Sequence, residues 1–212
     1  NNEIYEVYGT TSIENDVKTT HDEEKLLDYL KREVLPGVDA GELERVDSKF
    51  SRLLEVVDEI LSENKYEKII IFSYFKATLH YLSRRLNDEG ISTQLLMGGM
   101  RENKYEVIQK FKKNKDINIL MCSEVASEGV DLQFCRVLIN YDLPWNPMKI
   151  EQRIGRIDRI GQKHPTVTIW NLFHRDTIDE RIYRRLLDRL KIFERAMGGV
   201  NDVVGEEINK LT

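Results

Sequence analysis

The sequence predicts an α/β fold in which a parallel sheet carries helices on both faces. Five short apolar runs alternate with amphipathic stretches of helical period from residue 68 onward, and this alternation is typical of βαβ units. The runs are rich in Ile, Leu and Val, as expected for strands that are buried on both faces. A chain of 212 residues that is 41% hydrophobic can build one ordinary domain with some appended helix.

Two helices are expected before the sheet. Residues 1–22 show no apolar period and are expected to be irregular. A short helix is predicted over Asp22–Val34, because Leu26, Leu27, Leu30 and Val34 recur at helical spacing before Pro36-Gly37. Ser48 is expected to cap a second helix. The apolar stripe that should dock this second helix on a sheet comprises Phe50, Leu53, Leu54, Val57, Ile60 and Leu61.

The remaining elements follow in order along the chain. The predicted strands are Lys68–Ser73, Ile91–Leu96, Ile117–Cys122, Val137–Tyr141 and Val167–Asn171. The predicted helices are Lys76–Asn87, Arg101–Lys113, a short turn, Met148–Arg159, and Thr177 to about Met197, which Gly198-Gly199 ends. We therefore expect an N-terminal extension over residues 1–47, a main lobe over 48–175, and a C-terminal helix and tail packed on it over 176–212. Ligands of such sheets bind at the carboxyl ends of the strands.

Composition and charge restrict the classes of function. The net charge is -5, but the acid is concentrated at the front: Lys and Arg number 7 against 17 Asp and Glu in residues 1–63, 13 against 10 in 64–150, and 11 against 7 in 151–197. The mildly basic part permits phosphate contacts, although a solvated helix face would show the same excess. Cys122 and Cys135 have no partner at ligand spacing, so no disulfide framework and no zinc site are expected. We expect a cytoplasmic protein, associated with the nucleoid if prokaryotic, with no membrane segment.

The stretch from Glu151 to Gln162, Glu-Gln-Arg-Ile-Gly-Arg-Ile-Asp-Arg-Ile-Gly-Gln, is the most informative part of the sequence. On a helix, Gln152, Arg156 and Arg159 would share one face, while Ile150, Ile154 and Ile157 could face the sheet. An amide and two guanidiniums on one face suit a triphosphate, because guanidiniums bind phosphate oxygens bidentately and offset charge that develops on a transferring phosphoryl group. The alternative is an exposed helix with salt bridges to Glu151 and Asp158.

Three further segments carry polar or glycine residues where strands are predicted to end. The segment Ser123–Asp131 could present backbone amides and hydroxyls to a phosphate and a carboxylate to a ribose, although a plain turn capped by Asp131 is the alternative. Gly98 and Gly99 would let a nucleic-acid backbone approach main-chain amides. Asn146, between Pro144 and Pro147, is expected to cap the arginine helix. Trp145 could stack on a base or simply pack the loop.

These segments resemble the C-terminal lobe of superfamily 2 helicases of the Swi/Snf branch. Residues 152–159 resemble motif VI, Gln-Arg-x-Gly-Arg-x-x-Arg, and the Ile-Gly-Gln that follows is typical of this branch. Residues 120–132 resemble motif V, residues 142–147 match Asp-x-x-Trp-Asn-Pro, and residues 69–75 resemble motif IV. Residues 177–182 are most similar to the prokaryotic branch, and the resemblance covers about residues 48–197. It implies a RecA-like parallel sheet, as in the C-terminal lobes of P-loop helicases.

The resemblance implies a role for each matching residue. Arg156 and Arg159 would be the catalytic arginines that reach the γ-phosphate of ATP, which with Mg²⁺ would be held mainly by the N-terminal lobe of the same parent protein. The other residues implied on the ATP side are Gln152, Asp131, Gly129 and Gly155. Those implied on the side of double-stranded DNA are Ser73, Tyr74, Gly98, Gly99, Ser123, Glu124, Ser127 and Trp145. Glu124 and Glu128 depart from the Thr and Gly that are common at these positions of the family.

No G-x-x-x-x-G-K-[ST] loop and no acidic pair for Mg²⁺ occur in the sequence. We therefore expect no metal site in the chain, no ATPase activity from the isolated lobe, and a monomer. A second hypothesis is a non-catalytic interaction module that keeps the helicase fold. A third, a self-contained nucleotide-binding enzyme, is disfavoured because Ser73-Tyr74-Phe75-Lys76 stands where a Gly-rich fingerprint would follow the first strand.

Overall fold

The structure is a computed structural model that describes Tyr29, Arg32 and residues 39–124, 128–144, 146–158, 161–162, 164–181 and 183–184. Its contacts group into two compact units, Asn1–Glu55 and Val56–Thr212. The boundary lies inside helix α4 (Ser48–Glu63). Apart from Tyr29 and Arg32, the helix expected over Asp22–Val34 lies outside the described residues, as does most of the helix expected after Thr177. No described helix has the length and apolar character needed to cross a membrane.

The first unit contains a short helix that the sequence pattern did not predict and the start of α4. Helix α3 (Ala40–Arg45) begins after Asp39, whose carboxylate accepts a hydrogen bond from the amide of Gly41 at 2.8 Å. The cap expected for α4 is corrected by one residue: Asp47 Oδ1 accepts from the amide of Phe50 at 2.9 Å, and Ser48 already lies in the helix. A carboxylate three residues ahead of an unpaired amide satisfies that donor at the start of the helix.

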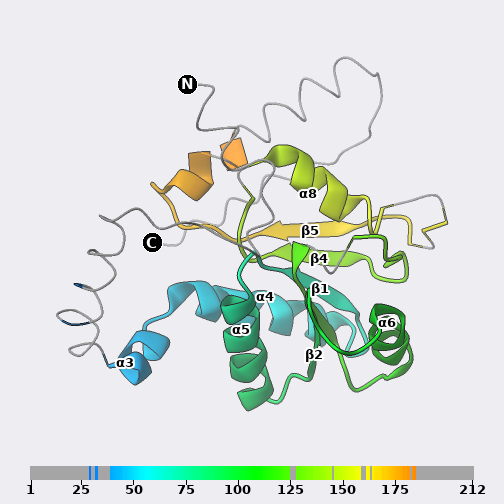
Figure 1. The fold of residues 1–212 in the computed structure, drawn as a ribbon, viewed down its shortest axis with the longest axis horizontal. Helices are drawn as coiled ribbons and strands as arrows, with labels where there is room; N and C mark the ends of the chain where they lie inside the picture. The colour runs from blue at the N-terminus through cyan, green and yellow to red at the C-terminus, as the bar shows by residue number, and fades with distance from the viewer. Residues whose placement is uncertain are drawn as a thin grey trace. The chain divides into compact units, whose positions relative to one another are not determined.

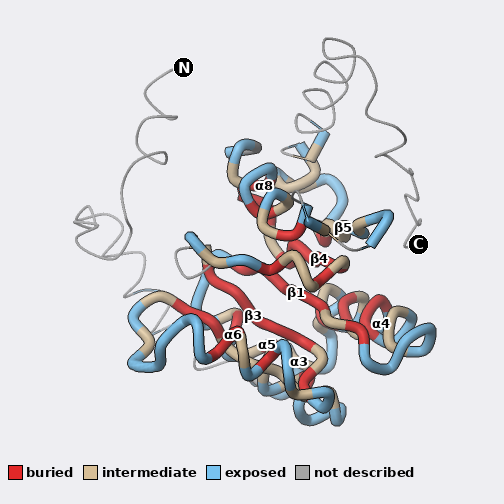
Figure 2. Tube along the Cα trace, turned by 90° about the vertical axis from the view of Figure 1, so that its right-hand side faces the viewer, coloured by how far each residue is buried: buried red, intermediate tan, exposed pale blue. Residues whose placement is uncertain are grey.

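The second unit is built on a five-stranded parallel sheet, as predicted (Figure 1). The strands are β1 (Ile69–Phe72), β2 (Thr93–Leu96), β3 (Ile119–Cys122), β4 (Val137–Asn140) and β5 (Thr168–Asn171), in the order β2-β3-β1-β4-β5. The three inner strands are buried along their whole length, whereas the edge strand β5 is partly exposed (Figure 2). The other edge strand, β2, is also partly exposed. Two-sided burial explains the near-continuous apolar runs of the inner strands.

Helices cover both faces of this sheet. From β1 the chain crosses over the position of β3 to form β2 at the edge, and it then returns in the opposite direction to form β3. Right-handed crossovers in opposite directions require α5 (Lys76–Asp88) and α6 (Lys104–Lys113) on opposite faces. Phe111 of α6 packs in one core cluster with Ile70 and Phe72. The neighbouring residue Ile71 points to the other face, which is the face of the buried leucines of α5, Leu79, Leu82 and Leu86.

Helix α8 (Pro147–Ile154) is shorter than the predicted span Met148–Arg159. It begins as expected, because Asn146 Oδ1 accepts from the amide of Met148 at 3.0 Å and Pro147 occupies the first turn. It ends before Gly155, where the amide of Arg156 turns to the carbonyl of Arg153 at 3.1 Å. Glycine is a poor helix former, and the tighter bond to the third preceding residue closes the last turn. Gln152 and Arg156 therefore do not share a face of one regular helix.

Candidate functional site

The carboxyl ends of neighbouring strands bring polar residues together, as the parallel sheet requires. Ser73 and Tyr74 follow β1, Glu124 lies two residues after the end of β3, and Asp142 lies two residues after the end of β4. The carboxylate of Asp142 accepts from the hydroxyl of Ser73 at 2.6 Å and from the amide of Tyr74 at 2.9 Å. At the other side of β3, the amide of Gly98 donates to Ser123 Oγ at 3.2 Å. Side-chain hydrogen bonds thus join the end of β1 to that of β4, and the end of β2 to that of β3.

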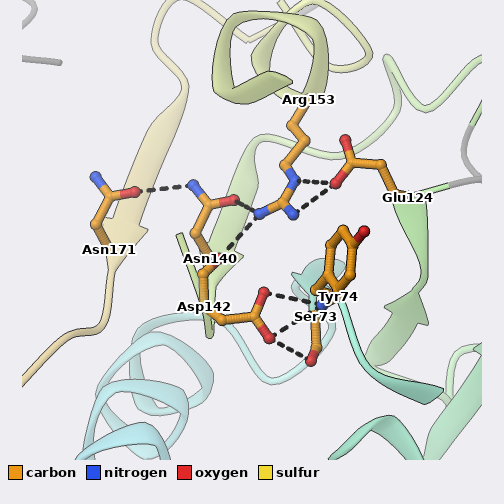
Figure 3. Close-up of polar contacts among 7 residues, drawn as sticks. All are labelled: Ser73, Tyr74, Glu124, Asn140, Asp142, Arg153 and Asn171. Carbon is orange, nitrogen blue, oxygen red and sulfur yellow. Dashed lines mark hydrogen bonds and ion pairs between the residues drawn. The ribbon is translucent and has the colours of Figure 1, made fainter. Parts of the chain in front are cut away.

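Arg153 lies at the centre of this network (Figure 3). Its guanidinium descends from α8 and donates to Glu124 Oε2 from Nη2 at 2.7 Å and from Nε at 3.1 Å. Nη1 donates to Asn140 Oδ1 at 2.8 Å and to the carbonyl of Asp142 at 3.1 Å. The guanidinium also lies over the ring of Phe72, with 5.0 Å between Cζ and the ring centroid. The guanidinium therefore contacts residues at the carboxyl ends of three strands, β3, β4 and β1.

Burial makes this ion pair different from a surface contact. The side chain of Arg153 is 1% exposed and that of Glu124 is 14% exposed. Removing one partner of a buried pair leaves an uncompensated charge and costs about 3–5 kcal/mol. Asn140 is fully buried and donates to Asn171 Oδ1 at 2.8 Å, so the hydrogen-bond network extends to β5. The arrangement fixes the orientation of the guanidinium and of the strand ends around it.

Burial and the nearby carboxylates of Glu124 and Asp142 raise the pKa of Tyr74. The phenol of Tyr74 therefore stays neutral. Tyr74 and Phe75 form an edge-to-face pair with ring centroids 5.3 Å apart, and both rings are exposed. Lys149 of α8 brings an ammonium within 6.0 Å of the Tyr74 ring centroid. The Tyr74 position predicted from sequence is thus accessible to a ligand.

The glycines predicted for close backbone approach lie at the end of β2. Gly99 is exposed and has φ of +79°, a conformation that favours glycine. A Cβ at Gly99 would meet only Lys76 Nζ, at 3.9 Å. The ammonium of Lys76 therefore lies close to the exposed backbone of Gly99. Together they form a small basic site that a phosphate could reach.

Arg156 meets an environment opposite to that of Arg153. Its side chain is partly exposed and forms no ion pair or hydrogen bond within the described part of the chain. Its backbone, in contrast, is held twice: its amide donates to the carbonyl of Arg153, and its carbonyl accepts from the amide of Leu132 at 3.3 Å. A fixed backbone with an unengaged guanidinium is an arrangement suited to an external anion.

The segment after β3 brings the predicted ribose contact beside Arg156. Asp131 is exposed and immediately precedes Leu132, and its Oδ1 accepts from the amide of Gln133 at 3.1 Å. The turn capped by Asp131, which the sequence offered as an alternative, is therefore present. Gly129 has φ of +75° with open space around it. Both residues line an open pocket of about 660 Å³ whose other wall includes Tyr105 of α6.

Several predicted positions fall outside the described residues, and several residues of the network were not predicted. Ser127, Trp145 and Arg159 belong to the first group. Gln152 is exposed on α8, and a Cβ at Gly155 would meet only the preceding helix turn. The residues that sequence reasoning missed are Arg153, Asn140, Asp142 and Asn171. A signal existed for Arg153, which is three residues after the buried Ile150 and four before the buried Ile157 and so shares their inward face.

Metal-ligating side chains do not gather anywhere in the described part of the chain: no group of three or more His, Cys, Asp or Glu could hold an ion there. Cys122 and Cys135 are buried free thiols, and burial raises the pKa of both. The site is therefore one of guanidinium, amide, hydroxyl and carboxylate groups. Groups of these kinds can bind anions and the hydroxyl groups of a ligand.

The chain belongs to the helicase conserved C-terminal domain family, which its residues 48–161 match. The similarity to solved structures confirms the predicted RecA-like α/β fold and the assignment to the Swi/Snf type. The C-terminal part of the Fun30 ATPase domain superimposes with a TM-score of 0.59 at 31% identity, over 64% of this chain and 44% of that one. The Sulfolobus solfataricus SWI2/SNF2 ATPase core in complex with dsDNA gives 0.56 at 25% identity, over 70% and 31%.

A curated relative extends the similarity beyond the sheet. The uncharacterized ATP-dependent helicase YqhH of Bacillus subtilis (strain 168) is 37% identical over 186 residues, which are 85% of this chain and 32% of that protein. The chain thus spans about a third of the length of this relative.

Proposed function

We propose that the chain is the second motor lobe of an ATP-dependent translocase that moves on double-stranded DNA. The observation that carries this proposal is the contrast between two arginines. Arg153 is buried and its guanidinium is bonded to Glu124, Asn140 and Asp142, whereas Arg156 has a fixed backbone and a guanidinium with no ion pair or hydrogen bond to the residues that the structure describes. A scaffold has no need of such a group on a backbone that is bonded to Leu132, the residue after the exposed Asp131. A lobe that completes a nucleotide site between two lobes does.

ATP supplies the phosphoryl group, and its transfer to water would drive movement along DNA. Arg156, with Arg159, would stabilise the charge that develops on this group, and Gln152 would support them. Asp131 would accept from a ribose hydroxyl beside the left-handed turn at Gly129, where the open backbone leaves room. These residues fit a ribose and a phosphate at the edge of the lobe. Mg²⁺ would be held mainly by the first lobe.

The DNA side of the proposal rests on the strand ends. Ser73 and Ser123 are buried, the Ser73 hydroxyl donates to Asp142, and the amide of Gly98 donates to Ser123 Oγ. The groups that a DNA phosphate could reach are therefore the exposed backbone of Gly99 and the ammonium of Lys76 beside it. Contacts of this kind position a protein on a phosphate backbone without reading sequence. The similarity to a SWI2/SNF2 core that was solved with double-stranded DNA supports duplex as the track. Glu124 faces Arg153, so we expect its contribution to DNA binding to be indirect. Work on duplex DNA would place the protein in the cytoplasm, at the nucleoid of a prokaryotic cell.

The test is DNA-stimulated ATP hydrolysis by the full-length protein that contains this lobe. Arg156→Ala should lower the turnover on the order of 10³-fold, as removal of an arginine finger does, and leave ATP binding largely intact. Arg159→Ala should behave similarly. The matched control is Arg84→Ala, since Arg84 is an exposed arginine of α5 that pairs with Asp88. Unchanged turnover in both Arg156→Ala and Arg159→Ala would overturn the proposal and favour the interaction module.

A further inference from the structure

The buried pair of Arg153 and Glu124 lies between the proposed DNA contacts and the proposed catalytic arginine, and nothing in the function so far requires it. Glu124 is one residue past Ser123, whose hydroxyl accepts from Gly98. Arg153 is three residues before Arg156 and accepts the Arg156 amide on its carbonyl. One ion pair therefore connects the end of β3 to the end of α8.

A second connection joins the same two segments. The amide of Leu132, the residue after Asp131, donates to the carbonyl of Arg156 at 3.3 Å. The segment that leaves β3 is thus attached to the C-terminal end of α8 at both of its ends, by Glu124 and by Leu132. Because α8 ends at Ile154, Arg156 lies beyond the helix, and these attachments hold it in place where regular helical bonds do not.

We infer that Glu124 and Arg153 are positioning residues for Arg156, so that the proposed arginine finger depends on a carboxylate 32 residues earlier in the chain. This inference rests on the proposed function. Without the carboxylate charge, Arg153 would no longer be held to Glu124, and α8 would be free to tilt. The Arg156 guanidinium would then shift with the end of the helix. A displacement of about 1 Å at a catalytic group can reduce a rate by about 100-fold, while substrate binding that is made elsewhere is retained.

The chain contains a matched control at the opposite edge of the sheet. Arg136, just before β4, donates from Nε and Nη2 to Glu67 Oε2 at 3.1 and 3.0 Å. Glu67 is 6% exposed and lies before β1. This pair has the same chemistry, the same two-donor geometry and similar burial on the carboxylate side. It lies at the amino ends of the strands, away from Arg156, so its loss should affect stability without affecting the position of the finger.

The experiment compares Glu124→Gln with Glu67→Gln in the full-length protein. For both variants one would measure kcat and KM for ATP at saturating duplex DNA, together with the melting temperature. We expect Glu124→Gln to lower kcat about 10- to 100-fold with KM within about threefold, and Glu67→Gln to keep kcat within about twofold although it melts earlier. Equal losses of kcat in the two variants, or no loss in Glu124→Gln, would show a merely structural pair and overturn the inference.

A second variant keeps the test decisive if Glu124→Gln does not fold. Arg153→Lys retains a positive charge facing Glu124 but lacks the donors that reach Asn140 and the Asp142 carbonyl together. It should show the same selective loss of kcat, and wild-type kcat in a folded Arg153→Lys protein would overturn the inference. Failure of the proposed function is distinguished by Arg156→Ala and Arg159→Ala: if both variants keep full activity, the proposed function fails and there is no finger to position, whatever Glu124→Gln does.

Discussion

At the scale of single residues, two arginines three positions apart have opposite surroundings. Arg153 donates to a carboxylate, an amide oxygen and a main-chain carbonyl, so its charge is balanced inside the protein. Arg156 has no such acceptor in the described residues and remains available to an external anion. Both occur in one short basic stretch, and only the fold distinguishes them. The same residue type therefore serves packing at one position and, as we propose, catalysis at the other.

The two cysteines provide a residue-scale prediction about the closed core of the sheet. Cys122 and Cys135 have no exposed surface, and burial raises the pKa of each thiol. Because only the thiolate reacts, Ellman's reagent should label neither cysteine in native buffer at pH 8, and raising the pH to 9 should not change this. Both should react at once in denaturant, which serves as the control. Rapid labelling of one thiol per chain in native buffer would contradict the burial of the two cysteines.

At the scale of elements, the caps of the helices allow a sharp comparison. The sequence pattern favours Ser48 as the cap of α4, but the structure assigns the bond to Asp47. Asp47→Ala should therefore lower the free energy of unfolding by about 1 kcal/mol, and Ser48→Ala should change it by less than about 0.5 kcal/mol. Urea denaturation of the 212-residue chain measures both. A larger loss in Ser48→Ala than in Asp47→Ala would restore the original expectation.

The elements also show which parts of the fold could be read from sequence. The strands were predictable because runs such as Ile69–Phe72 are apolar enough for burial on both faces. The end of α8 could not be predicted, because the apolar pattern of Ile150, Ile154 and Ile157 continues at helical spacing past Gly155, where the helix has already ended. The position of Glu124 was predictable as a strand end. Its partner was not, because pairing across 29 residues depends on which strands become neighbours.

The strand order explains why the candidate site could be predicted only in part. Positions such as Ser73 and Gly98 follow apolar runs directly, so their place at one edge of the sheet follows from parallel pairing. Asp142 meets Ser73 only because β4 pairs with β1 rather than with β3. The crossover that places β4 there carries no signature in the sequence of either strand.

At the scale of the whole molecule, charge is distributed unevenly along the chain. Acidic residues outnumber basic ones in residues 1–63, whereas the reverse holds in 64–150 and 151–197. The second unit, which contains the described strand ends, is thus better suited to an anionic ligand than the net charge of -5 indicates. Nucleotide and DNA would both be anions, and each would meet only part of its binding groups on this lobe.

The last prediction concerns this incompleteness. In this chain, the residues proposed for ATP contribute two arginines, a supporting amide and a ribose contact, and the described part holds no cluster that could bind a metal ion. The isolated 212-residue chain should therefore show no ATP hydrolysis above background, with or without duplex DNA, because the groups that bind the triphosphate and orient water would be missing. Steady-state phosphate release measures this, and the full-length protein should turn over ATP and respond to duplex under the same conditions.

The Arg156→Ala form of the isolated chain is the control for contaminating ATPase. Turnover by the isolated chain that depends on Arg156 would mean that this lobe holds a complete nucleotide site of its own, and turnover that survives Arg156→Ala would come from a contaminant.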